Sequence, residues 1–377
     1  MYYFATTVLG LEDVAASELE EILGVKPEVD VGKIFFKGDL SVVYRVNYFS
    51  RTINRVFIML LREEFETLED IYRHMKSIDY TWIMEPNKTF AIRSERVGNH
   101  PFTSIDIARI AGKAVIDSYM ESTGVRLRVN LDNPDVEIWV FARNRELLVG
   151  VNTTGESLHK RRYRVYNHPA ALKPTIAASM LRLGGYRGQP LLDPLCGGGT
   201  IAIEAAHAAR KVPIILFRHD FLLRNLKVHN ASLEEGIVSE LLSTMNNELY
   251  EIYCMDVSPK HLEGAMINAR SARVGDTIRF LLRDSTRKES HCDVKADLVV
   301  TNPPYGIRSH RLKKIGEFYE TLLRVLADSY KGKRLVIITA STRQLEEAAS
   351  KVGLTLEHSR HVMHGGLPTK IYVYRLE

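Results

Sequence analysis

Apolar positions recur with two different periods in the first 155 residues, and the two periods alternate along the chain. Apolar residues three and four positions apart predict amphipathic helices, whereas alternating apolar and polar residues predict half-buried strands. The resulting order is strand 1–9, helix 12–23, strand 33–37, helix 40–48 and strand 55–62, then helix 68–75, strand 89–95, helix 104–122 and strands 126–131, 137–143 and 146–152. Two successive α+β units are therefore predicted, with a division near residue 60.

Farther along, short apolar runs each end at a polar residue or a glycine turn. They predict strands that begin at Leu191, Tyr250, Ile278 and Ala296. Helical stretches separate these strands, which is typical of a parallel sheet, and ligands of such α/β folds bind where the carboxyl ends of the strands meet. The long segment 212–247, which is amphipathic at 233–245, predicts an inserted helical segment that either contacts the substrate or only covers the sheet.

The strand that begins at Ala296 is followed by Asn302, Pro303, Pro304 and Tyr305. Proline has no N–H to donate and fixes φ, so the strand ends there rigidly. The four residues supply an amide oxygen, a backbone carbonyl and a flat aromatic ring, which together can hold an amino group on a planar base. They are the candidate catalytic residues, and their motif resembles that of methyltransferases that modify exocyclic or backbone amines. A proline turn without a ligand would be the alternative if the motif stood alone.

A glycine-rich turn follows the strand at Leu191 and opens a helix. The candidate cofactor-binding residues in it are Asp193, Leu195, Cys196, Gly197, Gly199 and Thr200. Glycine allows the backbone to approach a ligand closely, and a helix N-terminus favours a negative group. The spacing is neither that of a dinucleotide fingerprint nor that of a phosphate loop. It resembles motif I of S-adenosylmethionine-dependent methyltransferases.

Residues at the next strand ends complete the expected cofactor site. Asp256, followed by Val257, comes directly after a strand, where a carboxylate can accept both hydroxyls of a ribose. By the same resemblance, Asp284, followed by Ser285, would accept from the adenine amino group, and Asn302 would border the cofactor. His168 and Pro169 begin a stretch that is similar to the family's motif X, which packs near the cofactor.

The N-terminal half carries a second resemblance. Segments 90–107, 133–135 and 152–164 look like a THUMP domain and its exit into a methyltransferase domain. Nearly the whole chain thus resembles the THUMP-containing guanosine N2-methyltransferases, and within them the tRNA enzymes that form N2-methylguanosine at position 6 of the acceptor stem. The resemblance implies tRNA as the partner, held at its acceptor stem and 3′ end.

The resemblance also implies a domain order and a fold class. It places a ferredoxin-like α+β domain at 1–60, a THUMP domain at 61–155, a basic linker at 156–166 and a methyltransferase domain at 167–377. The last of these is expected to be an α/β Rossmann fold that uses S-adenosylmethionine.

Bulk composition narrows the class of protein. The 377 residues are 45% hydrophobic and 26% charged, which is typical of a globular protein with two or three domains. No apolar run approaches the ~18 residues of a membrane span, and the N-terminus lacks the basic start of a signal peptide, so the cytoplasm is expected. Three cysteines without a C-x-x-C pair argue against a disulfide framework and a zinc site. No metal is expected, and a monomer is expected.

Basic residues are clustered in a chain whose net charge is only +5. Lys160, Arg161, Arg162 and Arg164 lie in the linker, and Arg308, Arg311 and Lys313 follow the candidate catalytic residues. Two such clusters, one beside the catalytic motif, suit contacts with RNA phosphates. Solvated charge runs are the alternative for each cluster.

The implied reaction depends on positioning and not on covalent catalysis. A guanine N2 lone pair is delocalised into the ring, so both of its N–H groups must be accepted, by the Asn302 side-chain oxygen and the Pro303 carbonyl. The ring of Tyr305, and not its hydroxyl, is expected to stack on the flipped base. A ribosomal-RNA guanosine N2-methyltransferase and an RNA-binding protein with an inactive methyltransferase fold remain alternatives. The modified nucleotide and the number of methyl groups added also remain open.

Overall fold

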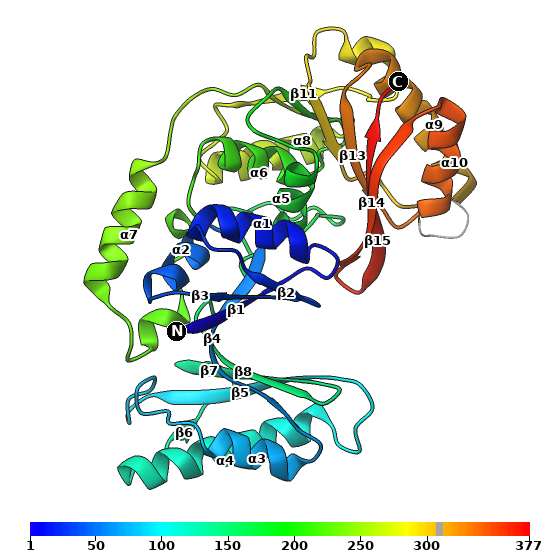
Figure 1. Cartoon of the computed structure of the whole chain (residues 1–377). Coiled ribbons are helices and arrows are strands. Elements are labelled where there is room, and N and C mark those ends of the chain that lie inside the picture. The colour runs from blue at the N-terminus through cyan, green and yellow to red at the C-terminus, as the bar shows by residue number, and fades with distance from the viewer. Residues whose placement is uncertain (307–311) are drawn as a thin grey trace.

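The computed structural model describes residues 1–306 and 312–377, without the side chains of residues 312 and 313. Within these residues, Figure 1 shows two separate β-sheets with helices packed on them. The first sheet has the order β2-β3-β1-β4-β8-β7-β5-β6. Its strands are β1 (Tyr2–Thr7), β2 (Glu28–Asp30), β3 (Lys33–Lys37), β4 (Ile53–Glu64), β5 (Thr89–Val97), β6 (Arg128–Val129), β7 (Val136–Arg143) and β8 (Glu146–Asn152). Its helices are α1 (Glu12–Leu23), α2 (Ser41–Phe49), α3 (Leu68–Lys76) and α4 (Ser104–Thr123).

The two α+β units predicted for this half share one continuous sheet. Strand β4 is 12 residues long and pairs with β1 along its first half and with β8 from Phe57 to Glu64. The division near residue 60 therefore falls inside a strand, next to the register shift between Met59 and Leu61. Local periodicity did not reveal β2, which has three residues of mostly exposed polar character, and it overestimated the length of β6.

The second sheet has the order β11-β10-β9-β12-β13-β15-β14. Its strands are β9 (Leu191–Asp193), β10 (Ile252–Asp256), β11 (Ile278–Leu282), β12 (Leu298–Thr301), β13 (Arg334–Thr339), β14 (Thr355–His364) and β15 (Leu367–Arg375). The first five in this order run parallel, and β15 and β14 add an antiparallel edge. Its helices are α5 (Pro174–Leu183), α6 (Thr200–Ala209), α8 (Pro259–Ser271), α9 (Leu312–Ser329) and α10 (Thr342–Val352). The predicted α/β Rossmann-type class is confirmed.

Helices cover both faces of this sheet because successive strand residues point in opposite directions. Leu191 and Cys254 enter the core shared with α5, α6 and α8. Their chain neighbours Leu192 and Met255 enter the core shared with α9 and α10. Burial on both faces explains why these strands are continuous apolar runs in the sequence.

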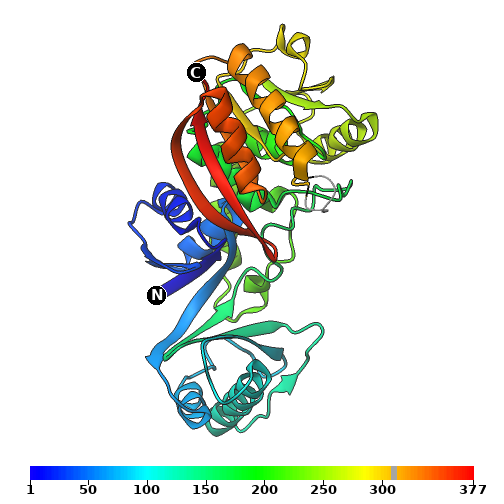
Figure 2. The ribbon, with the colours of Figure 1, turned by 90° about the vertical axis from the view of Figure 1, so that its right-hand side faces the viewer.

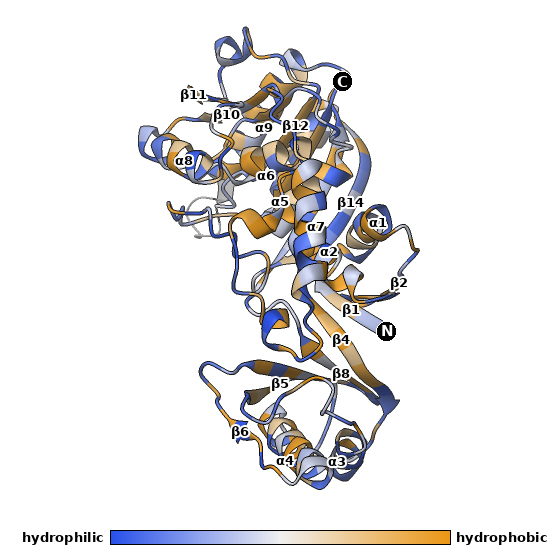
Figure 3. Ribbon diagram, turned by 90° about the vertical axis from the view of Figure 1, so that its left-hand side faces the viewer, coloured by the Kyte–Doolittle hydropathy of each residue, from blue (hydrophilic) through white to orange (hydrophobic). Residues whose placement is uncertain are grey.

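The inserted segment packs on the N-terminal half and not over the carboxyl edge of the second sheet. It contains η1 (Ile214–Leu216), η2 (Leu222–Asn225) and α7 (Ala231–Ser243). Helix α7 lies beside α2 in Figures 1 and 3, and its Ile237 and Leu241 belong to the N-terminal core. The Tyr48 hydroxyl donates to Glu234 at 2.6 Å, which fastens α7 to α2.

The two halves are also joined on the opposite side of the molecule from α7 (Figure 1). Figure 2 shows the hairpin of β14 and β15 reaching the N-terminal unit. There the Met363 amide donates to the Leu9 carbonyl at 3.4 Å, and Arg360 pairs with Asp13. Val8 and Leu11 complete the contact, because both lie in the core of the second sheet.

Candidate active site

The carboxyl ends of four neighbouring parallel strands bring the predicted site residues together. Strands β11, β10, β9 and β12 end in that order across the sheet, so the residues that follow them lie along one edge. Asp193 ends β9, Asp256 ends β10, and Asn302 follows β12. This is the edge at which open α/β sheets bind ligands.

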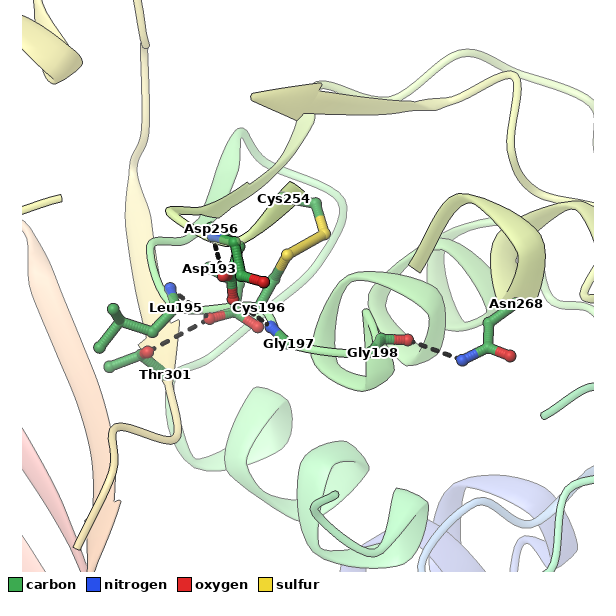
Figure 4. The surroundings of a disulfide bond; sticks show 10 residues. Asp193, Leu195, Cys196, Gly197, Gly198, Cys254, Asp256, Asn268 and Thr301 are labelled. Atoms are coloured by element: carbon green, nitrogen blue, oxygen red, sulfur yellow. Dashed lines mark hydrogen bonds between the residues drawn. A yellow bond between two sulfur atoms is a disulfide. The ribbon is translucent and has the colours of Figure 1, made fainter. Parts of the chain in front are cut away.

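The glycine turn after β9 is shaped by left-handed backbone conformations (Figure 4). Gly197 has φ of 52°, and Gly199, the N-cap of α6, has φ of 78°. Residues that have a Cβ rarely adopt these φ values, which explains why glycine occupies both positions. The Gly197 amide donates to Asp256 Oδ2 at 2.9 Å, so the turn of one strand is tied to the acid of the next.

A disulfide joins Cys196 of this turn to Cys254 of β10, with the two Cα atoms 5.5 Å apart (Figure 4). The argument from the sequence against a disulfide is therefore wrong for this pair. Cys196 and Cys254 are 58 residues apart in the chain, and only the parallel pairing of β9 with β10 brings them side by side. Cys292 is free and exposed.

Asp193 is buried beneath the glycine turn. Its Oδ1 accepts hydrogen bonds from the Leu195 amide at 3.3 Å and the Thr301 hydroxyl at 3.2 Å. Burial raises the pKa of Asp193 to about 8, because the carboxylate has lost its hydration and gains only weak partners in return. A positively charged ligand group beside it would favour the ionised form.

The other two acids, Asp256 and Asp284, each accept hydrogen bonds from backbone amides. Asp256 accepts from the Ser258 amide at 2.8 Å in addition to Gly197. Each oxygen of a carboxylate has two lone pairs, so Asp256 can still accept from two ribose hydroxyls. Val257 beside it is exposed.

Asp284 lies in the loop after β11. A hydrogen bond from the Thr286 side chain lowers the pKa of Asp284, and its Oδ1 accepts from that hydroxyl at 2.6 Å. Ser285 is buried, and its carbonyl lies 3.0 Å from His291 Nε2. Ser285 therefore supports the loop through its backbone carbonyl.

The candidate catalytic motif forms a short loop in which Asn302 is held at both ends of its amide. Asn302 Oδ1 accepts from the Tyr305 hydroxyl at 2.7 Å, and Nδ2 donates to the Ala170 carbonyl at 3.4 Å. Burial raises the pKa of Tyr305, so its hydroxyl stays a donor. The hydroxyl of Tyr305 thus has a partner that the sequence did not indicate.

The segment around His168 lies against the glycine turn. A Cβ on Gly197 would be 3.5 Å from the His168 ring, and the rings of His168 and His261 are 4.3 Å apart. Burial, more than the neighbouring His261, lowers the pKa of His168. Pro169 is exposed at the mouth of the site.

Asn268 is a site-supporting residue that the sequence analysis missed. Its Oδ1 accepts from the amides of Val165 and Tyr166, and its Nδ2 donates to the Gly198 carbonyl at 2.9 Å (Figure 4). A Cβ on Gly264 would approach the Tyr166 ring to 2.2 Å, so the same segment packs tightly on α8. The available signal was an asparagine on the apolar face of a predicted helix.

The basic linker residues have different surroundings. Arg161 is buried and donates to Glu204 at 3.2 Å and to the Arg51 carbonyl at 2.9 Å, so it is not accessible to a phosphate. Burial by itself would raise the pKa of Glu204, but the positive charges of Arg161 and Arg51 lower it. The prediction that Arg161 contacts RNA is wrong, because a buried carboxylate requires a cationic partner.

The other three basic residues of the linker, Lys160, Arg162 and Arg164, are more exposed than Arg161. Lys160 and Arg162 have side chains that are 57% and 50% exposed, and they share Glu156. Arg164 donates to the Thr200 hydroxyl at 3.0 Å, next to the glycine turn. Arg308 and Arg311 and the side chain of Lys313 lie outside the described residues.

Residues 1–306 and 312–377 contain neither a helix able to span a membrane nor a metal-binding cluster. No helix there combines the length and apolar character that a membrane span requires. No group of three or more His, Cys, Asp or Glu side chains there is arranged to hold a metal ion.

Known proteins resemble this chain along its whole length. Residues 161–370 match the family described as "RMKL-like, methyltransferase domain", residues 65–152 match the THUMP domain, and residues 2–57 match the "RlmL ferredoxin-like domain". The tRNA (guanine(6)-N2)-methyltransferase of Archaeoglobus fulgidus is 45% identical over 99% of this chain and 92% of its own length. The enzyme of the same name from Methanocaldococcus jannaschii is 40% identical over all of both chains.

Solved structures show the same fold. A possible methylase from Clostridium difficile 630 superposes with a TM-score of 0.89 at 24% identity, covering 100% of this chain and 98% of that one. A crystal structure of a complex with SAH superposes with a TM-score of 0.87 at 23% identity, with the same coverage. The fold and the family match define a methyltransferase of the Rossmann type. The chain belongs to the family of THUMP-containing guanosine N2-methyltransferases.

Proposed function

We propose that this enzyme methylates N2 of the guanosine at position 6 in the acceptor stem of tRNA, with S-adenosylmethionine as the methyl donor. The names of the two archaeal relatives, which match essentially the whole chain, support this substrate. The observation that carries the chemistry is the Asn302 amide, held with its oxygen at the carboxyl edge of the sheet.

S-adenosylmethionine supplies an activated methyl group when it is bound, and the chain must bring the target amine to it. The donor set fits this cofactor, because the glycine turn permits close backbone approach and acids stand at two neighbouring strand ends. Asp256 would accept from the ribose hydroxyls and Asp284 from the adenine amino group. The buried Asp193 would face the charged end of the cofactor.

The target amine would be oriented by two acceptors. Asn302 Oδ1 and the Pro303 carbonyl would each accept one N–H of guanine N2, which leaves the nitrogen lone pair directed at the methyl group. The ring of Tyr305 would stack on the flipped base. Its hydroxyl already donates to Asn302 Oδ1, so Tyr305 would also keep the amide in its acceptor orientation.

The remaining parts of the proposal concern RNA. Lys160, Arg162 and Arg164 lie between the N-terminal half and the glycine turn, where RNA phosphates that reach the site would pass. The THUMP half would hold the acceptor stem and 3′ end of tRNA. We further propose that the enzyme acts as a monomer in the cytoplasm, where its substrate is.

The test is nucleoside mass spectrometry of tRNA transcripts after incubation with the purified enzyme and S-adenosylmethionine. We expect N2-methylguanosine in a transcript with guanosine at position 6 and its loss in a matched transcript with adenosine there. Methylation that persists in the adenosine transcript would overturn the assignment to position 6. Methylation of ribosomal RNA in place of tRNA would overturn the tRNA assignment.

A further inference from the structure

Two hydroxyl side chains, from α9 and from the β13–α10 connection, hold the catalytic loop, and a third hydroxyl at the end of β13 supports one of them. Tyr319 of α9 is fully buried, and its hydroxyl donates to the Pro304 carbonyl at 2.9 Å. The same hydroxyl lies 2.8 Å from Thr339 Oγ1 at the end of β13. Ser341, at the start of α10, donates its hydroxyl to the Tyr305 carbonyl.

The proton positions in this cluster are determined by elimination. A carbonyl can only accept, so the single hydrogen of the Tyr319 hydroxyl is committed to Pro304. Thr339 must then donate to Tyr319, and its own oxygen is free to accept from the Ser341 amide, which lies 2.9 Å away. Burial raises the pKa of Tyr319 to about 12, so the hydroxyl keeps its hydrogen at neutral pH.

The consequence is that the loop is held on both sides of its reactive groups. Upstream, Thr301 belongs to β12 and donates to Asp193. Downstream, the carbonyls of Pro304 and Tyr305 are held by side-chain hydroxyls. Between them lie the Asn302 amide and the Pro303 carbonyl. Within the described residues no hydrogen-bond donor contacts the Pro303 carbonyl.

We propose that Tyr319, acting with Thr339 and Ser341, is a positioning residue that sets the direction of the Asn302 and Pro303 acceptors toward the target amine. The inference rests on the proposed function of those two acceptors. Tyr319 does not touch the substrate, and its effect on the reaction passes through the backbone of Pro304. An oriented reaction loses rate steeply when its acceptors are displaced, whereas binding through distant groups is little affected.

The decisive variant is Tyr319→Phe in the full chain, which removes only the donor oxygen. We expect kcat on tRNA to fall about 10- to 100-fold. The KM for tRNA and the dissociation constant of S-adenosylmethionine, measured by calorimetry, should each stay within about threefold. Hydrogen exchange of a peptide that ends at Tyr305 should become faster, and this readout requires no substrate.

Two further variants separate positioning from a general loss of stability. Tyr80→Phe is the matched control, because Tyr80 is also fully buried and donates to a carbonyl, that of Met75 at 2.8 Å, but lies in the N-terminal half. Tyr80→Phe should have the same melting temperature as Tyr319→Phe, but it should retain the kcat of the wild-type enzyme. Thr339→Val should reproduce the loss of kcat, and Thr339→Ser should restore it.

A kcat for Tyr319→Phe equal to that of Tyr80→Phe would overturn the inference. So would a parallel loss of cofactor affinity, since that would indicate a damaged fold. Failure of the proposed function has a different signature: the wild-type enzyme would then methylate another nucleotide, while the exchange measurement and the ratio of variant to wild-type rate would still report on Tyr319.

Discussion

Removal of the disulfide between Cys196 and Cys254 should lower the stability of the methyltransferase half by a calculable amount. The bond closes a chain segment with a sequence separation of 58. In the chain-entropy treatment, a loop of this length restricts the unfolded state by about 4 kcal/mol. For a domain of this size that corresponds to a decrease in melting temperature on the order of 10 °C. The substitution Cys254→Ala is suitable, because Cys254 lies in β10 and away from the backbone of the glycine turn.

The assay is thermal and guanidinium unfolding without reductant, together with thiol titration of the unfolded protein. Wild-type protein should show one reactive thiol, that of Cys292, out of its three cysteines. Cys254→Ala should show two thiols and the lower melting temperature. Cys292→Ala is the matched control, since it should show no free thiol and unchanged stability. Reductant should destabilise the wild-type protein and leave Cys254→Ala as it was.

The same variant tests whether the bond also preorganises the cofactor site. Cys196 precedes Gly197, whose amide donates to Asp256, so a released turn should bind S-adenosylmethionine more weakly. Three reactive thiols in the wild-type protein, with equal melting temperatures for wild type and Cys254→Ala, would refute the reasoning. Equal cofactor affinity in a destabilised variant would refute only the preorganisation.

The other predictions concern single groups of the site and the joint between the halves. Asn302→Ala should reduce single-turnover methylation by a factor on the order of 10²–10³ while calorimetry shows retained cofactor binding; near wild-type turnover would exclude Asn302 as an acceptor. Asp256→Ala should weaken S-adenosylmethionine binding by about 1.5–3 kcal/mol, and unchanged affinity in a folded variant would mean that Asp256 is not the ribose ligand. Burial raises the pKa of Asp193 from 3.8 to about 8, so its stabilising contribution is complete below about pH 4 and is lost as pH rises through 8. For the cofactor-free protein, the free energy of unfolding of Asp193→Asn should therefore increase relative to that of wild type as the pH rises across that range. A difference that does not change with pH would contradict the raised pKa of Asp193. A chain that starts at residue 156 should aggregate or melt without cooperativity, because it exposes surfaces that Val8, Leu11 and the N-terminal core cover; a monomeric fragment with a sharp transition would show that the halves fold independently.

Much of the local structure was accessible from periodicity. The helix at 12–23 and the strands at 33–37 and 146–152 begin and end where the pattern predicted them, and the third strand of the C-terminal half begins at Ile278 as predicted. Each buries apolar side chains at regular intervals against neighbouring elements, so its period can be recognised in consecutive residues. Short polar strands such as β2 leave no such pattern, because they bury almost nothing.

The motifs at the strand ends were accessible for a different reason. Asp193, Asp256 and Asn302 stand where apolar runs stop, and parallel strands present their carboxyl ends at one edge. Placing the acids on strand ends therefore places them near one another without knowledge of the side-chain contacts. The predicted methyltransferase fold is confirmed on this basis and by the family match.

Pairings between distant residues were decided by the tertiary structure alone. The sequence shows three cysteines and a run of basic residues, but it does not show that Cys196 meets Cys254 or that Arg161 meets Glu204. Likewise it shows a tyrosine in the catalytic motif, and only the folded loop turns the Tyr305 hydroxyl toward Asn302. A residue type and its position in a periodic pattern are local properties, whereas its partner depends on where the rest of the chain passes. The sequence by itself therefore determined the class of fold and the chemistry gathered at the sheet edge. The tertiary packing of distant segments decided which charges, thiols and hydroxyls were left free to act there.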